Sequence, residues 1–177
     1  MGTIISVVDM SLDGYYDRMD EWFDPEDQRR QQMSDELHHA ADAVLIGRET
    51  YEFLSEFWPK QDGEFADLVN AMPKYVASRT LKGDLDWNST ILDGPIEESV
   101  RRLKEQHRLI VSWGFGELGT SLIKAGLLDE LRVYLHPFVV GKGDQEFGNS
   151  TAFRLHTNEA TVLANGSVMI SYRPEAL

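Results

Sequence analysis

The stretch Val44-Leu45-Ile46-Gly47-Arg48-Glu49-Thr50-Tyr51-Glu52 decides the fold that the chain is expected to adopt. Three apolar residues run directly into a glycine, an arginine and then helix-forming residues, which predicts a buried strand, a tight turn and a helix N-terminus. Such a junction suits a phosphate, because unpaired N–H groups and the positive end of the helix dipole meet there. Gly47 leaves room for a ligand, Arg48 supplies a planar cation and Thr50 supplies a hydroxyl. The alternative is an ordinary strand–helix turn whose arginine faces water, and the local sequence does not decide between the two.

The length, the net charge and the lack of cysteine exclude several classes of partner and site. The chain has 177 residues, of which 42% are hydrophobic, as is typical of a globular protein with its own core. The net charge of −13 disfavours nucleic acid and anionic membranes as partners, so any pocket for an anion must be built from a few local basic groups. The absence of cysteine excludes disulfides, thiol nucleophiles and thiolate metal sites, and it fits a cytoplasmic location.

Membrane and metal sites are not expected. The N-terminus Met1-Gly2-Thr3-Ile4-Ile5-Ser6 lacks the features of a signal peptide, and no apolar run approaches the roughly 20 residues of a membrane span. His38 and His39 are adjacent on a predicted helix and therefore point in different directions, so they make a poor metal pair. His136 alternates with apolar strand residues, which predicts a strand-surface or interface position rather than a catalytic one.

Helices and strands alternate up to about Leu128, and strands dominate after it. The expected strands are 3–8, 43–46, 74–80, 89–92, 109–113, 129–140, 153–156, 159–164 and 167–173, with Asn165-Gly166 as a hairpin turn. The expected helices are one opened by Pro25 and running to about Ala41, then 50–57, 64–72, one opened by Pro95, and 120–125; Tyr15–Asp24 is expected to be an irregular surface loop. This order predicts an α/β fold, in which a mostly parallel central sheet with an antiparallel C-terminal edge is flanked by helices, in a single domain over residues 1–177.

Polar groups follow three of the predicted parallel strands. They are Gly47-Arg48-Glu49-Thr50, Ser78-Arg79-Thr80 and the glycine-rich turn from Gly114 to Gly119. Because parallel strands present their carboxyl ends at one edge of a sheet, these segments are expected to form one groove. Two arginines, three hydroxyls and two helix N-termini suit a pyrophosphate with an additional phosphate, such as the 2′-phosphate of NADP.

The turn Gly114-Phe115-Gly116-Glu117-Leu118-Gly119 also matches the dinucleotide pattern G-x-G-x-x-G after a strand. A Rossmann unit is nevertheless not expected. The motif comes too late in the chain to leave room for the rest of the unit. The acidic residue that should follow about 20 residues later is missing, because that region reads Tyr134-Leu135-His136.

Five segments in this order resemble the dihydrofolate reductase-like family, in the form of the reductase domain of the bifunctional riboflavin-biosynthesis deaminase–reductase. They are Ser11-Leu12-Asp13-Gly14, Leu45-Ile46-Gly47-Arg48-Glu49-Thr50-Tyr51, Lys74-Tyr75-Val76-Ala77-Ser78-Arg79-Thr80-Leu81, Gly114-x-Gly116-Glu117-Leu118, and Gly126-Leu127-Leu128-Asp129-Glu130 followed by Pro137-Phe138-Val139-Val140-Gly141-Lys142-Gly143. The resemblance extends from about Thr3 to Tyr172. It implies a central sheet of about eight strands, NADPH bound along the strand ends, a small-molecule substrate and a homodimer.

The resemblance also implies roles for the matched residues. Gly47, Arg48 and Thr50 would hold the pyrophosphate, and Ser78, Arg79 and Thr80 would meet the adenosine 2′-phosphate. The turn Gly114, Phe115, Gly116, Glu117 and Leu118 would line the nicotinamide–ribose side, and Asp13 and Gly14 would border the nicotinamide pocket. Asp13 is the candidate catalytic group, with capping of its own loop as the alternative role.

Some features depart from the family pattern. Phe115 separates Gly114 and Gly116, where relatives carry adjacent small residues and a non-proline cis peptide. The deaminase half is absent. The helical carboxylate of folate reductases would fall near Gln31, which argues against a folate substrate.

Two function classes follow from these observations. The first is an NADPH-dependent reductase of a small heterocyclic or carbonyl substrate, with the 5-amino-6-(5-phosphoribosylamino)uracil reductase of riboflavin biosynthesis as one candidate. The second is a non-catalytic dimeric binding module on the same fold. Trp22, Phe23 and Trp58 are candidates for the substrate pocket, and packing of surface loops is their alternative role.

Overall fold

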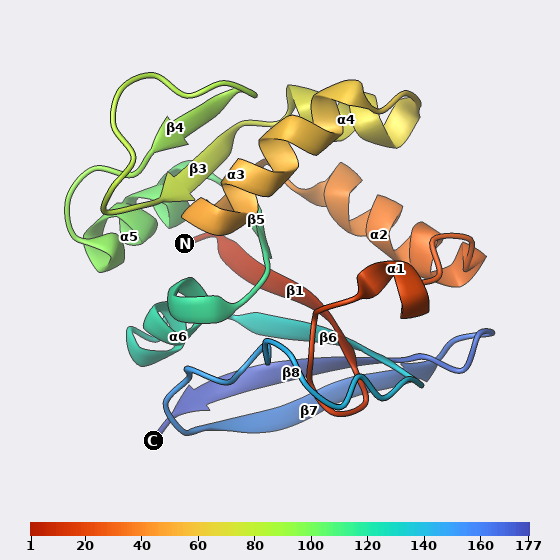
Figure 1. Cartoon of the computed structure of the whole chain (residues 1–177). Coiled ribbons are helices and arrows are strands. Elements are labelled where there is room, and N and C mark those ends of the chain that lie inside the picture. Colours follow the sequence, from red (N-terminus) through yellow and green to blue (C-terminus); the bar gives the residue numbers. More distant parts are fainter.

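The computed structural model describes residues 1–177 and contains one eight-stranded sheet with the strand order β4-β3-β2-β5-β1-β6-β8-β7. The pairs from β4 to β6 are parallel, whereas β6–β8 and β8–β7 are antiparallel. This confirms the predicted mostly parallel sheet with an antiparallel C-terminal edge. In Figure 1 the hairpin of β7 and β8 lies at the opposite end of the sheet from β3 and β4. The strands are β1 (Thr3–Ser11), β2 (Ala43–Gly47), β3 (Lys74–Ala77), β4 (Ser89–Ile91), β5 (Leu109–Trp113), β6 (Glu130–His136), β7 (Phe153–Val162) and β8 (Val168–Ala176).

Helices cover both faces of the parallel part of the sheet. On one face α5 and α6 pack on the main core, and on the other α2 and α3 pack on smaller clusters. None of the helices combines the length and the hydropathy that crossing a membrane requires. The helices are α1 (Met19–Trp22), α2 (Gln28–Ala40), α3 (Arg48–Phe57), the 3₁₀ turn η1 (Trp58–Lys60), α4 (Glu64–Ala71), α5 (Ile96–Gln106) and α6 (Gly116–Lys124).

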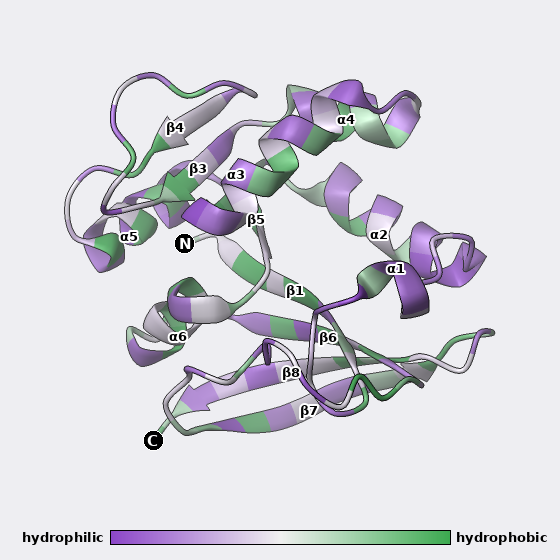
Figure 2. Cartoon of the chain, in the orientation of Figure 1, coloured by the Kyte–Doolittle hydropathy of each residue, from purple (hydrophilic) through white to green (hydrophobic).

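Strand β2 is buried on both faces. Ala43, Val44, Leu45 and Ile46 are all 0% exposed, and their side chains alternate between the core under α5 and α6 and the cluster that contains Tyr51 of α3. A continuous apolar run is what a strand covered on both faces requires. In contrast α2 is mostly hydrophilic (Figure 2), and it buries only Met33, Leu37 and His38.

The start of the first long helix differs from the prediction. Pro25 does not open it: α2 begins at Gln28, and the side chain of Asp27 accepts a hydrogen bond from the Arg30 N–H. This carboxylate satisfies one of the N–H groups that a helix start leaves without a partner, so it marks the boundary more strongly than the proline does. The preceding segment, predicted as an irregular loop, contains the short helix α1.

Other boundaries also shift. Strand β3 ends at Ala77 rather than Thr80, because the Ser78 hydroxyl accepts from the N–H groups of Thr80 and Leu81 and turns the chain. Helix α6 begins inside the glycine-rich turn, earlier than the predicted Thr120, and α3 begins at Arg48. The two predicted strands after Phe153 form one strand, β7, with an irregularity between Thr157 and Glu159. No peptide bond is cis.

A substitution at Gly119 tests how closely α6 packs on the Phe115 ring. A Cβ at this position would overlap the ring of Phe115, which is buried against Phe147 and Phe153. We expect Gly119→Ala to destabilise the protein by about 1–3 kcal/mol, because overpacking outweighs the better helix propensity of alanine. Urea unfolding measures this, with the exposed Lys124→Ala in the same helix as the control. A Gly119→Ala protein as stable as the control would contradict the packing.

Candidate functional site

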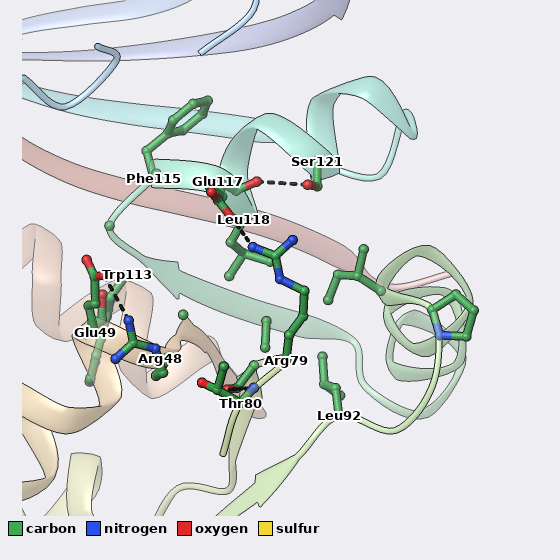
Figure 3. Close-up of a pocket in the computed structure, with 18 of the residues that line it drawn as sticks. Arg48, Glu49, Arg79, Thr80, Leu92, Trp113, Phe115, Glu117, Leu118 and Ser121 are labelled. Atoms are coloured by element: carbon green, nitrogen blue, oxygen red, sulfur yellow. Dashed lines mark hydrogen bonds and ion pairs between the residues drawn. The ribbon is translucent and has the colours of Figure 1, made fainter. Parts of the chain in front are cut away.

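A cleft lies at the carboxyl ends of β2, β3 and β5, and its volume is about 600 Å³. Arg48 and Arg79 both line it, which confirms that the two arginines share one cleft (Figure 3). The volume falls in the range of about 300–1,000 Å³ that is typical of small-molecule and cofactor sites. Of the residues predicted to bind a cofactor, the structure places these along the cleft: Gly47, Arg48, Thr50, Ser78, Arg79, Thr80, Gly114, Phe115, Gly116, Glu117 and Leu118. The segment after β4 also lines the cleft, with Leu92, Gly94, Pro95 and Ile96, and nothing in the sequence pattern predicted this.

The glycines at the strand ends keep the cleft open. Gly47 has a negative φ, so its backbone conformation does not require glycine. A Cβ at this position would meet no atom within 4 Å, so the space beside it is open. Its lack of a side chain therefore leaves space beside the first turn of α3. Gly114 and Gly116 have φ of 71° and 49°, in the left-handed region that favours glycine, and this turn leads the chain from β5 directly into α6.

Both arginines of the cleft are paired with carboxylates. Arg48 contacts Glu49 at 3.1 Å and Glu52 at 2.9 Å, and Arg79 contacts Glu117 at 3.0 Å. Figure 3 shows the Arg79–Glu117 pair between the end of β3 and the first turn of α6. A phosphate that uses the same N–H donors must therefore exchange with a carboxylate. The pairs are exposed, and exposed pairs contribute about 0–1 kcal/mol, so such an exchange is energetically accessible.

The glycine turn is held from behind by a carboxyl group that sequence reasoning missed. The N–H of Phe115 donates to Glu146 Oε1 at 2.8 Å, and the Phe115 ring points into the core, so only its backbone faces the cleft. Burial raises the pKa of Glu146 to about 7, and the nearby Asp9 carboxylate adds to this effect while the Phe115 N–H opposes it. Nothing in Asp144-Gln145-Glu146 distinguishes this residue in the sequence.

Asp13 and Gly14 are not among the residues that line the cleft. The Asp13 carboxylate accepts from the Ser11 hydroxyl at 2.7 Å and from the N–H groups of Val140 and Gly141 at 3.1 and 2.8 Å. These contacts tie the loop after β1 to the loop after β6, which is a capping role. The catalytic role of Asp13 stays a prediction.

His136 is not at a surface, so that prediction is wrong. It is 1% exposed, its Nε2 lies 2.9 Å from Asp9 Oδ1, and its Nδ1 lies 3.1 Å from the Ser167 hydroxyl. Arg30 donates to the same Asp9 carboxylate at 2.6 and 3.2 Å. Burial alone would raise the pKa of Asp9, but the His136 contact and the Arg30 charge outweigh it and hold this pKa below its usual value. A carboxylate within a central strand needs a basic or hydrogen-bonding partner. The acidic residue in this apolar run is therefore the sequence feature that could have indicated a buried polar cluster.

Of the aromatic candidates, Trp22 and Phe23 pack on His136 with ring centroids at 4.9 and 5.9 Å, and Trp58 packs on Phe65 at 5.5 Å. None of the three is among the residues that line the cleft. The tryptophan that does line it is Trp113, whose indole N–H donates to His38 Nε2 at 2.9 Å. Burial lowers the pKa of His38, which keeps this nitrogen free to accept.

The Glu146 carboxyl makes the stability of the protein depend on pH. The pKa of Glu146 is 4.5 in the unfolded chain and about 7 in the folded protein. As the pH rises from 4.5 through 7 the unfolded chain ionises more readily, so the free energy of unfolding falls over this range. We expect Glu146→Gln, which keeps an acceptor for the Phe115 N–H, to be more stable than the wild type by about 3 kcal/mol at pH 8. The difference should shrink to near zero below about pH 4, under the unfolded-state pKa of 4.5. Urea unfolding at both pH values measures it, with the exposed Glu105→Gln as a control that should show no such dependence.

The fold is similar to that of several known structures. A protein from Shewanella sp. PV-4 that is provisionally assigned to riboflavin biosynthesis superposes with a TM-score of 0.77 at 18% identity, covering 98% of this chain and 99% of that one. The deaminase/5-amino-6-(5-phosphoribosylamino)uracil reductase of Thermotoga maritima gives 0.68 at 14% identity, covering 98% of this chain and 56% of that one. Dihydrofolate reductase from Enterococcus faecalis, complexed with NADP(H), gives 0.64 at 14% identity, covering 98% and 96%.

Sequence comparison leads to the same group of proteins. The uncharacterized protein YyaP of Bacillus subtilis (strain 168) is 33% identical over 112 residues, which are 60% of this chain and 59% of that protein. The chain therefore aligns with less than two thirds of the length of this relative. A model of the RibD C-terminal domain matches residues 2–169, and the chain belongs to that family.

Proposed function

We propose that the protein is an NADPH-dependent reductase that transfers a hydride to a small heterocyclic or carbonyl substrate. The reduction of 5-amino-6-(5-phosphoribosylamino)uracil is our candidate reaction. The observation that supports this most is the meeting of Arg48 and Arg79 in one cleft, beside the first turns of α3 and α6. In a chain with a net charge of −13, such a concentration of anion-binding groups suits a ligand that carries several phosphates.

The strand order suggests how the cofactor lies. Since the sheet runs β3-β2-β5-β1, the groups after β3 come first, those after β2 next and the glycine turn after β5 last. Ser78, Arg79 and Thr80 then hold the 2′-phosphate, and Gly47, Arg48 and Thr50 hold the pyrophosphate. Gly114, Gly116 and Leu118 line the side of the nicotinamide ribose, with the backbone of Phe115 between the glycines, whereas the Glu117 side chain reaches back to Arg79 at 3.0 Å. The substrate lies toward the end of β1.

The residues present fit such a cofactor. Open space beside Gly47 and Gly116 lets phosphate oxygens approach the backbone, and the two guanidiniums provide charge-assisted hydrogen bonds. When bound, NADPH supplies the hydride. The protein orients it, and Trp113, held by His38, forms part of the wall. Glu146, whose pKa is about 7, is the group beside the glycine turn that holds a proton near neutral pH.

The relatives support the proposal at the level of chemistry. The family is that of the RibD C-terminal domain, a Thermotoga maritima neighbour is named as a uracil-derivative reductase, and another neighbour is a dihydrofolate reductase complexed with NADP(H). Identity to these structures is 14%, so they support the fold and a nicotinamide cofactor rather than a particular substrate.

A homodimer through the late strands is part of the proposal. Val162 of β7 is 74% exposed and pairs with Val168 of β8, which in turn pairs with Leu135 of β6. This apolar row suits burial against a second copy. The same row supports the second candidate function, a non-catalytic dimeric binding module, which differs from the first in binding no dinucleotide.

Titration with NADPH and NADH tests the assignment of Arg79. We expect Arg79→Ala to weaken NADPH by about tenfold or more and NADH much less, because only NADPH has a 2′-phosphate for this guanidinium. The matched variant Arg48→Ala should weaken both cofactors alike, since both have a pyrophosphate. Quenching of tryptophan fluorescence is the measurement, and Trp113 lies in the cleft. Equal losses in Arg79→Ala would contradict the 2′-phosphate role, and absence of binding by the wild type at millimolar concentration would leave only the binding module.

A further inference from the structure

The Arg79–Glu117 ion pair extends across the mouth of the cleft. Arg79 follows β3 and Glu117 lies in the first turn of α6, 38 residues later, and Nη2 of the arginine donates to Oε2 of the glutamate at 3.0 Å. Glu117 is the only ionic partner of Arg79. The two side chains are 88% and 81% exposed, so no buried packing holds them together and their mutual attraction is what orients Arg79 over the cleft (Figure 3).

The dipole of helix α6 explains why the Glu117 carboxylate lies at this position. The N-terminus of a helix attracts negative charge, and Glu117 supplies it at the first turn of α6. This is also where the proposed cofactor brings its own negative charge. Glu117 and a phosphate therefore compete for one guanidinium, and a dianionic phosphate near Glu117 is in addition repelled by it.

We propose that Glu117 sets the preference of the cleft between NADPH and NADH, by competing with the 2′-phosphate for Arg79. The proposal rests on the proposed function, because it assumes a nicotinamide dinucleotide in this cleft. A 2′-phosphate that takes the Nη2 donor of Arg79 displaces the carboxylate, whereas NADH leaves the ion pair intact. The free 2′-hydroxyl of NADH can donate to the carboxylate, as acidic residues accept from ribose hydroxyls in other dinucleotide sites. The pair thus lowers the selectivity that Arg79 alone would give.

The cleft offers a matched control in Glu49. Its side chain is 84% exposed and it pairs with Arg48 at 3.1 Å, so it resembles Glu117 in exposure and pair distance, and Glu52 pairs with Arg48 as well at 2.9 Å. Arg48 lies at the end of β2, where the pyrophosphate common to both cofactors is placed. Removing the charge of Glu49 should therefore change the affinities for NADPH and NADH by the same factor and leave their ratio unchanged.

The test is calorimetric titration of the wild type, Glu117→Gln, Glu49→Gln and the double variant Arg79→Gln/Glu117→Gln with NADPH, NADH and adenosine 2′,5′-bisphosphate. We expect Glu117→Gln to bind NADPH and the bisphosphate about three to ten times more tightly, and NADH no more tightly than the wild type does. Glu49→Gln should keep the wild-type ratio of the two cofactors. The gain should vanish in the double variant, because there is then no guanidinium to release. Thermal unfolding confirms that each variant is folded.

The outcomes separate this proposal from the proposed function. If NADPH and NADH bind but Glu117→Gln leaves their ratio unchanged, or Glu49→Gln shifts it equally, the role of Glu117 is overturned and the cofactor site stands. If Glu117→Gln tightens only the bisphosphate while neither intact cofactor binds any variant, the competition for Arg79 stands and the reductase proposal falls. If no variant binds any of the three compounds, both are overturned.

Discussion

The parallel pairing of β3, β2, β5 and β1 is the constraint on which the rest of the molecule depends. Every residue from Ala43 to Ile46 is fully buried, so β2 must lie between two strands and under helices on both faces. Parallel strands need crossover connections, and the helices in these connections cover both faces of the sheet. All the strand-to-helix turns then open at one edge of the sheet, and this is why segments distant in sequence share one cleft.

The electrostatics of the cleft follow from its position on an acidic chain. With a net charge of −13, the general field of the protein does not attract an anion, so the cleft depends on local groups. Arg48 and Arg79 provide these, yet carboxylates of the same cleft pair with both. An arriving phosphate exchanges with partners of similar strength instead of meeting free cations. The affinity of such a site depends on the free energy of the arginine–phosphate pairs that form minus that of the arginine–carboxylate pairs that break. A single carboxylate can therefore change which ligand the site prefers.

Behind the cleft the structure uses buried polar contacts to fix the walls. Asp9, near the carboxyl end of β1, is held by Arg30 of α2 and His136 of β6, which joins a helix and two strands at the side where the substrate is proposed to lie. His38 holds the Trp113 indole, and Glu146 holds the Phe115 N–H of the glycine turn. Removing one partner of such a buried set leaves the other without compensation, so these groups keep the shape of the site.

The sequence by itself determined the sheet with its antiparallel edge, the two arginines that follow strands and the glycines that leave space beside them. These features are local. Consecutive residues specify both a strand that is buried on two faces and the turn that leads from it into a helix. It misplaced the start of α2, since Pro25 is a weaker boundary than the Asp27 cap, and it placed His136 at a surface because alternation alone does not show what covers a strand. Only the tertiary structure decided that Glu117 faces Arg79, that Glu146 is partly buried against the glycine turn and that Asp9 meets His136. Each of these pairs joins residues far apart in the chain, and their meeting depends on strand order and loop path, which no local pattern of residues specifies.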